Sequence, residues 1–317
     1  MCVICGCGEG DVAIAEVGVE GSGAHVHQHA DGTVHSHDHA HDHEHLHEHG
    51  HDHSHDHDHD HEHDHSHDHA HEHPHPHGHD SRQHRHDLSV PGRDTQTIAL
   101  EAAVLGKNQA LAERNRGWLA GRGVLALNLM SSPGSGKTTL LERSIRDLQG
   151  QVEIAVVEGD QATTHDAERI RATGARAVQI NTGTGCHLEA DMLGRALELL
   201  QPAAGSLLVI ENVGNLVCPA LFDLCEKARV VIFSVTEGED KPLKYPHMFS
   251  RADVLVLSKI DLLPHLRVDL SKMIDNALAI NPGLKVFPVS AYTGEGLGEW
   301  HGWLRHKLAH VAGAAHP

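Results

Sequence analysis

The sequence predicts a Rossmann-like α/β domain with a mainly parallel sheet, preceded by a disordered histidine-rich tail. Three observations support this prediction. Strand-like apolar runs alternate with helical segments after residue 93, as in parallel sheets covered on both faces. One of these runs leads into a glycine-rich loop that opens a helix. The chain of 317 residues also contains 36 histidines, and 28 of them lie between His25 and His86.

Acidic charge is concentrated in the first 90 residues, which hold 19 Asp and Glu against two basic residues, Arg82 and Arg85. The whole chain has 44 acidic and 25 basic residues, so residues 91–317 have 25 acidic and 23 basic residues and are nearly neutral. A nucleic-acid-binding protein needs a basic face, so that class is excluded. No apolar run reaches the ~18 residues of a membrane helix, and the start lacks a signal peptide's regions. We expect a soluble cytoplasmic protein.

Residues 1–24 are expected to form a metal-binding segment. Cys2, Cys5 and Cys7 crowd the first seven positions, with glycines between and after them that permit tight turns. Disulfides are rare in the cytosol, and no βαβ pattern adjoins the cysteines to suggest a thioredoxin-like role. Three thiolates would hold a late transition metal tightly. The alternative is a frayed terminus with incidental cysteines.

Residues 25–92 are expected to form a disordered metal-binding tract. From His35 to His79 nearly every second residue is histidine, interleaved mostly with Asp and Glu. Such a segment has almost nothing apolar to bury and cannot offset the entropy of ordering. Imidazoles at i and i+2 project to one side of an extended chain and suit Ni²⁺, Cu²⁺ and Zn²⁺. We interpret the tract as a multi-ion store or buffer; a solvating linker or an expression tag is the alternative.

Residues 93–317 begin with a predicted helix over 95–121 and a buried strand over 124–130. The strand runs into SSPGSGKTT, a phosphate-binding loop in its strand–loop–helix context, with Ser131 where the motif usually has its first glycine. Backbone amides and the helix N-terminus cradle phosphates in such loops. Lys137 is expected to reach the β- and γ-phosphates, and Thr138 to ligate Mg²⁺. The loop residues expected to bind nucleotide are Gly134, Ser135, Gly136, Lys137, Thr138 and Thr139.

Acidic residues end or follow two of the later predicted strands. Ligands of open α/β sheets collect at the carboxyl ends of strands, so Asp160, Asp166 and Glu211 join Lys137 as catalytic candidates. Glu211 stands where an acidic residue commonly holds Mg²⁺ or its water, and Asp166 is ranked first for positioning the attacking water. The later strands are predicted over 154–158, 177–181, 206–211, 229–235, 254–258 and 285–289.

A guanine-recognition motif is expected at the last two strand ends. Residues 258–261, Ser-Lys-Ile-Asp, resemble the N/T-K-x-D motif, with Ser258 in place of the usual Asn. The Asp261 carboxylate would accept from guanine N1 and the 2-amino group, which adenine cannot supply. A helix-capping Asp is the alternative. Ser290 and Ala291 resemble the loop that contacts guanine O6, so Lys259, Asp261, Ser290 and Ala291 complete the expected GTP site.

Three further cysteines need separate interpretations. Cys186, His187 and Cys218 give three ligands of the zinc type, one short of a closed tetrahedral site. Water, a transferred metal or a second subunit would fill the open position. The alternative is two buried thiols and a capping histidine. Cys225 sits at core-like helical spacing and is interpreted as structural.

These motifs together resemble the HypB family of hydrogenase nickel-incorporation GTPases. The resemblance rests on the Cys-x-x-Cys-Gly-Cys start, the histidine tract and the segments SSPGSGKTT, EGDQATTHDAERI, NTGTGCHLEADM, ENVGNLVCP and SVTEGEDKPLKYP. It implies a SIMIBI-class P-loop GTPase that dimerises with nucleotide or metal. The implied activity is delivery of Ni²⁺ to the large-subunit precursor of nickel–iron hydrogenase, with a HypA-type accessory protein. By resemblance, Cys2, Cys5 and Cys7 form a tight nickel site, and Cys186, His187 and Cys218 a weaker Ni²⁺/Zn²⁺ site at the dimer interface.

Two other functions remain open at this point. The chain could be a nickel store whose GTPase domain is only regulatory. It could also be a related GTPase of the urease nickel-insertion type, some of which have histidine-rich starts. The cysteine-rich terminus and the Gly-Cys-His and Val-Cys-Pro pair favour the HypB family, since the urease proteins typically carry a Cys-Pro-His motif.

Overall fold

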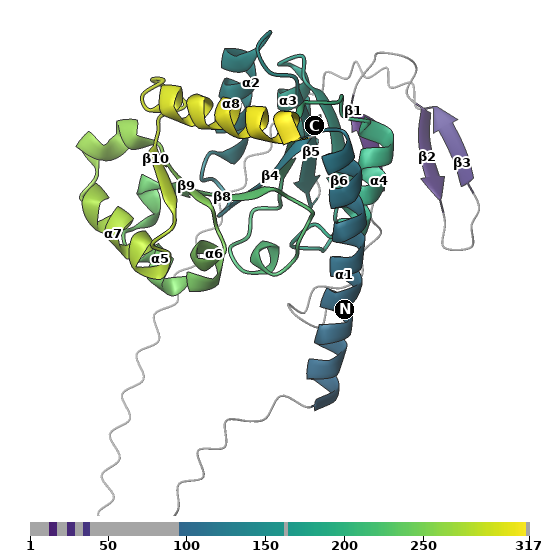
Figure 1. Ribbon diagram of the computed structural model, residues 1–317, viewed down its shortest axis with the longest axis horizontal. Coiled ribbons are helices and arrows are strands. Elements are labelled where there is room, and N and C mark those ends of the chain that lie inside the picture. The colour runs from purple at the N-terminus through teal and green to yellow at the C-terminus, as the bar shows by residue number, and fades with distance from the viewer. Residues whose placement is uncertain (1–12, 18–23, 29–33, 39–94, 162–163, 315–317) are drawn as a thin grey trace, which may run out of the picture. The chain divides into compact units, whose positions relative to one another are not determined.

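The computed structural model describes residues 13–17, 24–28, 34–38, 95–161 and 164–314 (Figure 1). The chain divides into two units. The first comprises Met1–Val19 together with Arg93–Pro317, and the second comprises Glu20–Gly92. The cysteine cluster at positions 2–7 and the tract from residue 39 to residue 94 lie outside the described residues.

The first unit contains an eight-stranded sheet with the phosphate-loop strand near its middle. Seven strands run parallel, and one edge strand is antiparallel. The predicted α/β fold with a mainly parallel sheet is therefore confirmed. The strand order is β1 (Ala13–Val17), β6 (Arg176–Asn181), β5 (Ile154–Asp160), β7 (Leu207–Glu211), β4 (Leu125–Ser131), β8 (Ala228–Ser234), β9 (Val254–Ser258) and β10 (Lys285–Pro288).

The edge strand β1 was not predicted. It pairs with β6 so that Ala13 faces Asn181 and Val17 faces Ala177. Ile14 of β1 packs against the core beneath α4 (Ala190–Leu200). Through this pairing, β1 provides hydrogen-bonding partners for the backbone groups on the outer side of β6. An uncovered edge strand would lack such partners.

The second unit contains a short antiparallel pair, β2 (Ala24–Gln28) and β3 (Val34–Asp38). The sequence led us to expect no strands in the histidine tract, so these two segments depart from that expectation. In the backbone register of the pair, His25 is opposite His37 and His27 is opposite His35. Alternation of period two matches the pleat of a strand, and backbone pairing here does not require apolar side chains.

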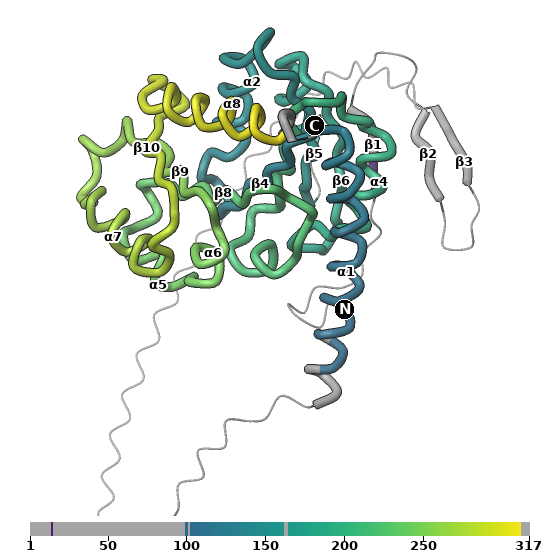
Figure 2. The backbone as a smooth tube through the Cα atoms, in the orientation of Figure 1, coloured from purple at the N-terminus to yellow at the C-terminus, as the bar shows by residue number. Residues whose placement is uncertain are grey.

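Helices cover both faces of the sheet (Figures 1 and 2). Leu125, Leu127 and Leu129 of β4 pack toward one face, and Ala126 and Met130 pack toward the other, because successive side chains alternate along a strand. The first face is covered by α2 (Lys137–Leu148), α3 (His165–Arg171) and α8 (Leu297–Ala314). The second face is covered by α1 (Thr95–Gly121), α4, α6 (Pro246–Ser250) and α7 (Leu270–Ile280), with α5 (Lys241–Lys244) beside α7.

The helical spacing expected around Cys225 is wrong, because side chains turn the chain there. Asp223 Oδ1 accepts from the Cys225 amide at 2.7 Å, and Glu226 Oε2 accepts from the Leu224 amide at 2.8 Å. Cys225 consequently has a φ of 75°. The thiol is nevertheless buried in the core, as expected of a structural cysteine, and burial raises its pKa.

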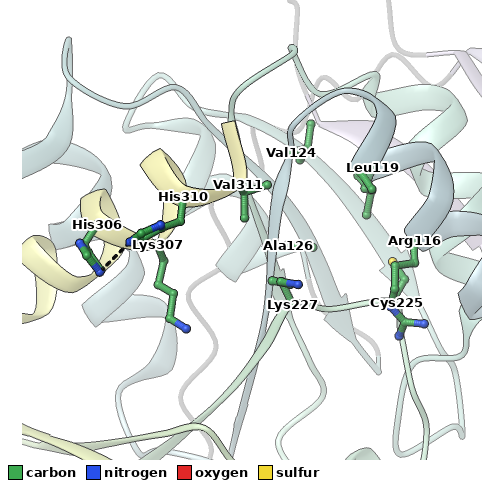
Figure 3. Close-up of a pocket in the computed structure, with 11 residues that line it drawn as sticks. Arg116, Leu119, Val124, Ala126, Cys225, Lys227, His306, Lys307, His310 and Val311 are labelled. Carbon is green, nitrogen blue, oxygen red and sulfur yellow. Dashed lines mark hydrogen bonds between the residues drawn. The ribbon is translucent and has the colours of Figure 1, made fainter. Parts of the chain in front are cut away.

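A cavity of about 660 Å³ lies between α1, the start of β4 and the last turns of α8 (Figure 3). It is at the opposite end of β4 from the phosphate loop. In the described part of the chain, no helix is both long and apolar enough to span a membrane.

Candidate nucleotide and metal site

The phosphate loop joins β4 to α2 as the sequence predicts. Gly134 and Gly136 have φ values of 73° and 90°, in the left-handed region that glycine enters at little cost. The second of these ends the loop, and α2 begins at Lys137. The loop borders a cavity of about 470 Å³ that is also lined by residues of β5, α3 and the segment after β7. The amides at the start of α2 therefore border a space suited to phosphate groups.

Lys137, Thr138 and Glu211 meet at the base of this loop. Lys137 Nζ lies 3.2 Å from Glu211 Oε1, and Thr138 Oγ1 donates to the same oxygen at 2.6 Å. Glu211 is 1% exposed, and its Oε2 has no hydrogen-bond partner in the described structure. A hydroxyl and a carboxylate with a spare buried oxygen suit a hard cation such as Mg²⁺.

Glu158 is a second buried carboxylate that the sequence analysis did not select. It faces Glu211 across the β5–β7 pair, is 2% exposed, and also has an Oε2 with no hydrogen-bond partner in the described residues. Burial and then the negative charge of Glu211 raise the pKa of Glu158 to about 8. Two adjacent carboxylates with unused oxygens fit a divalent cation. The sequence signal that could have identified Glu158 is an acidic residue within an otherwise apolar strand.

Asp160 and Asp166 both line the phosphate cavity. Asp166 Oδ1 lies 3.1 Å from Arg169 Nη1, so its carboxylate is paired with a cation at the cavity rim. Arg169 Nη2 also contacts Glu142 at 2.6 Å and Thr139 Oγ1 at 3.0 Å. This arginine joins α3 to the first two turns of α2 and was not predicted from the sequence. Water positioning by Asp166 stays a prediction.

Lys259 supports the phosphate loop through a contact with its backbone. Its Nζ donates to Gly134 O at 2.6 Å, and Ser258 Oγ donates to Ser135 O at 2.6 Å. Lys259 has a φ of 62°, so the strand end turns sharply there. Lys259, a predicted nucleotide-binding residue, and Ser258 before it therefore hold the loop in place.

Asp261 and Ser290 lie on adjacent loops. The Ile260 amide donates to Val289 O at 3.3 Å, which brings the turn after β9 (Ile260–His265) against the end of β10. Ser290 is fully buried, and its Oγ accepts from the Thr293 amide at 3.0 Å. The carbonyl of Ala291 accepts from Arg143 at 3.0 Å. The structure thus brings the predicted base-recognition residues together, and their contact with guanine stays a prediction.

Glu237 is a third functional candidate that sequence reasoning missed. Its carboxylate accepts from Ser135 Oγ at 2.8 Å and from Ser132 Oγ, and it pairs with Lys241 Nζ at 2.6 Å. Although burial raises the pKa of Glu237, hydrogen bonds from Lys241 and Ser132 hold it below the usual value. Glu237 therefore fixes the hydroxyls of the phosphate loop.

The three predicted ligands Cys186, His187 and Cys218 converge. One ligand atom from each lies within 4.8 Å of the others. His187 is 4% exposed and stacks on Phe222 with ring centroids 4.0 Å apart. Its Nδ1 lies 3.6 Å from Cys186 Sγ.

The other side of the His187 ring faces a carboxylate. His187 Nε2 has no hydrogen bond in the described structure, and Glu189 Oε1 lies 3.6 Å from it. A carboxylate behind a ligating histidine is a common arrangement at metal sites. Two sulfurs and an imidazole fit a late transition metal.

Asn212 connects the two sites. It follows Glu211 directly, is 1% exposed, and its Oδ1 accepts from the Leu188 amide at 3.2 Å. Leu188 in turn follows His187. Two residues beyond Asn212, a Cβ on Gly214 would lie 3.2 Å from Pro133 Cα in the phosphate loop. The segment after β7 therefore touches both the phosphate loop and the chain that carries the metal ligands.

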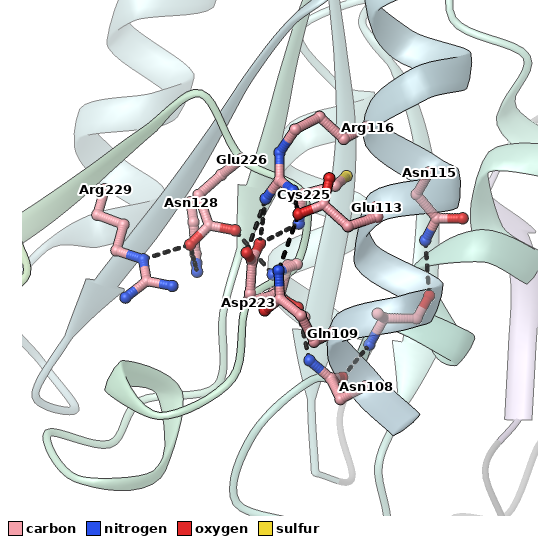
Figure 4. Close-up of polar contacts among 12 residues, drawn as sticks. Asn108, Gln109, Glu113, Asn115, Arg116, Asn128, Asp223, Cys225, Glu226 and Arg229 are labelled. Carbon is pink, nitrogen blue, oxygen red and sulfur yellow. Dashed lines mark hydrogen bonds and ion pairs between the residues drawn. The ribbon is translucent and has the colours of Figure 1, made fainter. Parts of the chain in front are cut away.

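Helix α1 contacts both segments that supply the cysteines and histidine, through Asn108 and Arg116, which Figure 4 shows with their hydrogen bonds. Asn108 Oδ1 accepts from the Ala190 amide at 2.8 Å, and Asn108 Nδ2 donates to Asp223 O at 2.8 Å. Arg116 Nη2 donates to both carboxylate oxygens of Asp223, each at 2.7 Å. Ala190 follows His187 by three residues, and Asp223 follows Cys218 by five. One helix thus ties down both arms of the metal cluster.

Comparison with known proteins agrees with this geometry. Residues 125–288 match the model of the CobW/HypB/UreG nucleotide-binding domain. The hydrogenase maturation factor HypB of Rhizobium leguminosarum bv. viciae is 57% identical over 224 residues, covering 70% of this chain and 75% of that protein. HypB of Escherichia coli K12 is 55% identical over 207 residues, covering 65% and 71%.

The chain belongs to the HypB family of hydrogenase maturation factors. Two solved HypB structures share its fold with TM-scores of 0.61. That of Archaeoglobus fulgidus is 43% identical and covers 64% of this chain and all of that one. That of Helicobacter pylori, solved in complex with nickel, is 38% identical and covers 64% and 96%. As a HypB-family protein with an intact phosphate loop, the chain is a GTPase.

Proposed function

We propose that this HypB-family GTPase uses GTP binding and hydrolysis to control delivery of nickel to the large-subunit precursor of a nickel–iron hydrogenase. The observation that supports this proposal most strongly is the Asn212 contact, because it joins the segment after Glu211 to the segment that carries His187. A change at the γ-phosphate would therefore reach the metal ligands through one side chain. The nickel-bound H. pylori relative supports nickel as the cargo.

The phosphate site is suited to GTP with Mg²⁺. Thr138, Glu211 and Glu158 are the residues that would hold the ion, which when bound neutralises charge on the β- and γ-phosphates. Lys137, which contacts Glu211 in the structure, would then be free to contact phosphate oxygens. Asp160 and Asp166 at the cavity rim are the candidates for orienting the attacking water.

The cysteine–histidine cluster is suited to Ni²⁺ or Zn²⁺. Its three ligands leave at least one position open, and Val217, beside Cys218, has 50% of its surface exposed. An exposed apolar residue next to an incomplete metal site supports a homodimer that shares the site. Deprotonated thiolates and neutral imidazole are the binding forms, so the ion should bind more weakly as the pH falls.

The segments outside the described residues complete the proposal. Cys2, Cys5 and Cys7 would form a tight nickel site, and the histidine tract would store or buffer further ions. Transfer between these sites and the hydrogenase precursor would involve a HypA-type nickel accessory protein. We infer the partners from the family to which the chain belongs, and the metal sites from the chemistry of the candidate ligands.

Two alternatives have specific support. The 28 histidines between His25 and His86 favour a nickel store with a regulatory GTPase domain. The matched domain description also includes UreG, which keeps a urease-type nickel-insertion role open. Measuring both hydrogenase and urease activity in the same complemented cells distinguishes the urease-type role from the proposed hydrogenase role.

The deciding experiment measures hydrogenase maturation in cells whose own copy of the gene is deleted. We expect Lys137→Ala to abolish both GTP hydrolysis and maturation, because it removes a phosphate contact without disturbing the core. Deletion of residues 25–86 should impair maturation only when nickel is scarce. Lys272→Ala removes an exposed lysine paired with Glu239 and serves as the control. If only the deletion reduced maturation, the storage function would replace the proposed switch.

A further inference from the structure

A histidine pair on the last helix has no role in the site described above. His306 and His310 lie one turn apart on α8, and both are exposed. Their Nε2 atoms are 3.1 Å apart, with ring centroids separated by 4.4 Å and ring planes at 82° (Figure 3). Both rings thus aim the same nitrogen at one point beside the cavity of about 660 Å³.

We propose that His306 and His310 form a second binding site for a divalent cation of the Ni²⁺ or Cu²⁺ type. With metal–nitrogen bonds of about 2.1 Å, two nitrogens 3.1 Å apart subtend about 95° at a shared ion. That angle is close to the 90° of square-planar or octahedral coordination and well below the tetrahedral angle that Zn²⁺ prefers. The spacing therefore suits nickel or copper better than zinc.

The pair can accept an ion without breaking the helix. Without metal, one Nε2–H donates to the other Nε2, so one of the two lone pairs is occupied by a proton. Binding needs that proton to move to Nδ1 of the same ring, after which both Nε2 lone pairs are available to the ion and no proton is released. Helix α8 is anchored in the core by Trp300 and Trp303, so the two rings are presented on a rigid element.

The surroundings leave the remaining coordination positions open. Lys307 Nζ lies over the Trp303 ring at 5.8 Å, and Arg305 Nη1 donates to Gln151 at 3.4 Å, so both neighbouring cations have partners elsewhere. The cavity gives room for water ligands. Arg116 and Lys227 also line the cavity; the charge of Arg116 is offset by Asp223, and Lys227 favours an anionic ligand such as a carboxylate as the third donor.

The test uses the full-length protein in solutions where a chelating buffer fixes the free Ni²⁺ concentration. The histidine tract and the cysteines then fill according to their own affinities without depleting the ion. Diethyl pyrocarbonate acylates imidazole nitrogens that are not bound to metal, and mass spectrometry reads each histidine separately. We expect His306 and His310 to become protected together. The single exposed histidines His247 and His265 are internal controls that should stay reactive.

The variant His310→Gln removes one ligand and keeps a helix-forming side chain. The free Ni²⁺ concentration that half-protects His306 should then rise about tenfold or more, since even the loss of a supporting partner costs metal sites about 10–100-fold. His306→Gln should have the same effect on His310, and His265→Gln should change neither. Equal protection of His306 in the wild type and in His310→Gln, or no protection of the pair, would overturn the proposal.

Discussion

Glu158 shows how one residue's surroundings determine its chemistry. Its carboxyl is buried beside Glu211, and the desolvation and negative charge raise its pKa to about 8. In the absence of a cation the group is therefore mostly protonated at neutral pH. A divalent ion between the two carboxylates would reverse this preference, so binding of Mg²⁺ and loss of a proton should occur together.

The stability of the nucleotide-free protein should depend on this proton. Because the folded protein holds this proton more tightly than the unfolded chain, the group's contribution to the unfolding free energy is full below the unfolded pKa of 4.5. The contribution is lost as the pH rises through the folded pKa of about 8. Glu158→Gln removes the titrating group, so its unfolding free energy should fall less over this pH range than that of the wild type, by several kcal/mol at most. Urea unfolding at a series of pH values measures the difference. The exposed neighbour variant Glu153→Gln should match the wild type, and an identical pH dependence in all three proteins would remove Glu158 from this account.

Asp261 should determine the choice of base. Asp261→Asn replaces the carboxylate that would accept from guanine N1 and the 2-amino group with an amide suited to the N1–H and 2-oxo edge of xanthine. We expect a lower affinity for GTP and a higher affinity for xanthosine triphosphate, measured by nucleotide titration. An unchanged preference for GTP would place the base elsewhere.

Individual residues were predictable where a local motif specifies them. The spacing of the phosphate loop identified Lys137 and Thr138, and a strand end identified Glu211. Arg169 and Glu237 were missed because their roles arise from contacts with α2 and the phosphate loop, made by segments distant in sequence. No local pattern specifies such contacts.

At the scale of elements, the parallel strands and α1 were predictable from apolar periodicity. Helix α1 has the predicted bounds, and each strand of the parallel sheet agrees with its predicted range within two residues. The edge strand β1 was missed because its pairing depends on the unsatisfied backbone of β6, far along the chain. The turn around Cys225 was misread as helical because two acidic side chains there bond to backbone amides.

Helix α1 should act as a clamp on the metal cluster. Asn108→Ala removes two hydrogen bonds to the segments that carry His187 and Cys218. We expect a loss of about 1–3 kcal/mol in unfolding free energy and weaker nickel binding at the cluster by about tenfold or more. Denaturation and nickel titration measure the two effects. Gln109→Ala, which loses only an exposed contact with Glu113, is the matched control. Equal nickel affinity in both variants would show that the helix does not position the ligands.

At the scale of the whole molecule, the chain separates into a nucleotide-binding unit and a histidine-rich unit. The hydrophobic clusters of the described chain contain no residue of the second unit. Storage of ions and hydrolysis of GTP should therefore be separable. The boundary near residue 92 coincides with the sharp change in composition and charge there, whereas the grouping of Met1–Val19 with the nucleotide-binding unit was not expected from the sequence.

Deletion of residues 25–86 should lower the nickel bound per chain many-fold and leave the GTPase rate nearly unchanged, since the tract contributes nothing to the described cores. Metal analysis of the purified protein and a phosphate-release assay measure the two quantities. Replacing the same residues with a Gly-Ser linker of equal length controls for the spacing. A large loss of GTPase activity in both proteins would show that the tract acts on the nucleotide site.

The central claim is that nucleotide state and metal binding are coupled through the segment after Glu211. A shift of ~1 Å at Cys218 would spoil metal–sulfur bonds of about 2.3 Å. By linkage, Ni²⁺ must then change the affinity for GTP relative to GDP by the same factor as the nucleotide changes the affinity for Ni²⁺. Typical couplings are about 1–3 kcal/mol, or roughly 5–150-fold.

The most direct test is a Ni²⁺ titration with GDP and with a non-hydrolysable GTP analogue. The protein should lack residues 25–86 and carry serine at positions 2, 5 and 7, so that, of the metal sites named above, the cluster of Cys186, His187 and Cys218 and the pair of His306 and His310 remain. We predict different Ni²⁺ affinities of the cluster in the two nucleotide states, and loss of that difference in Cys218→Ala. Identical affinities with GDP and with the GTP analogue would contradict the switch.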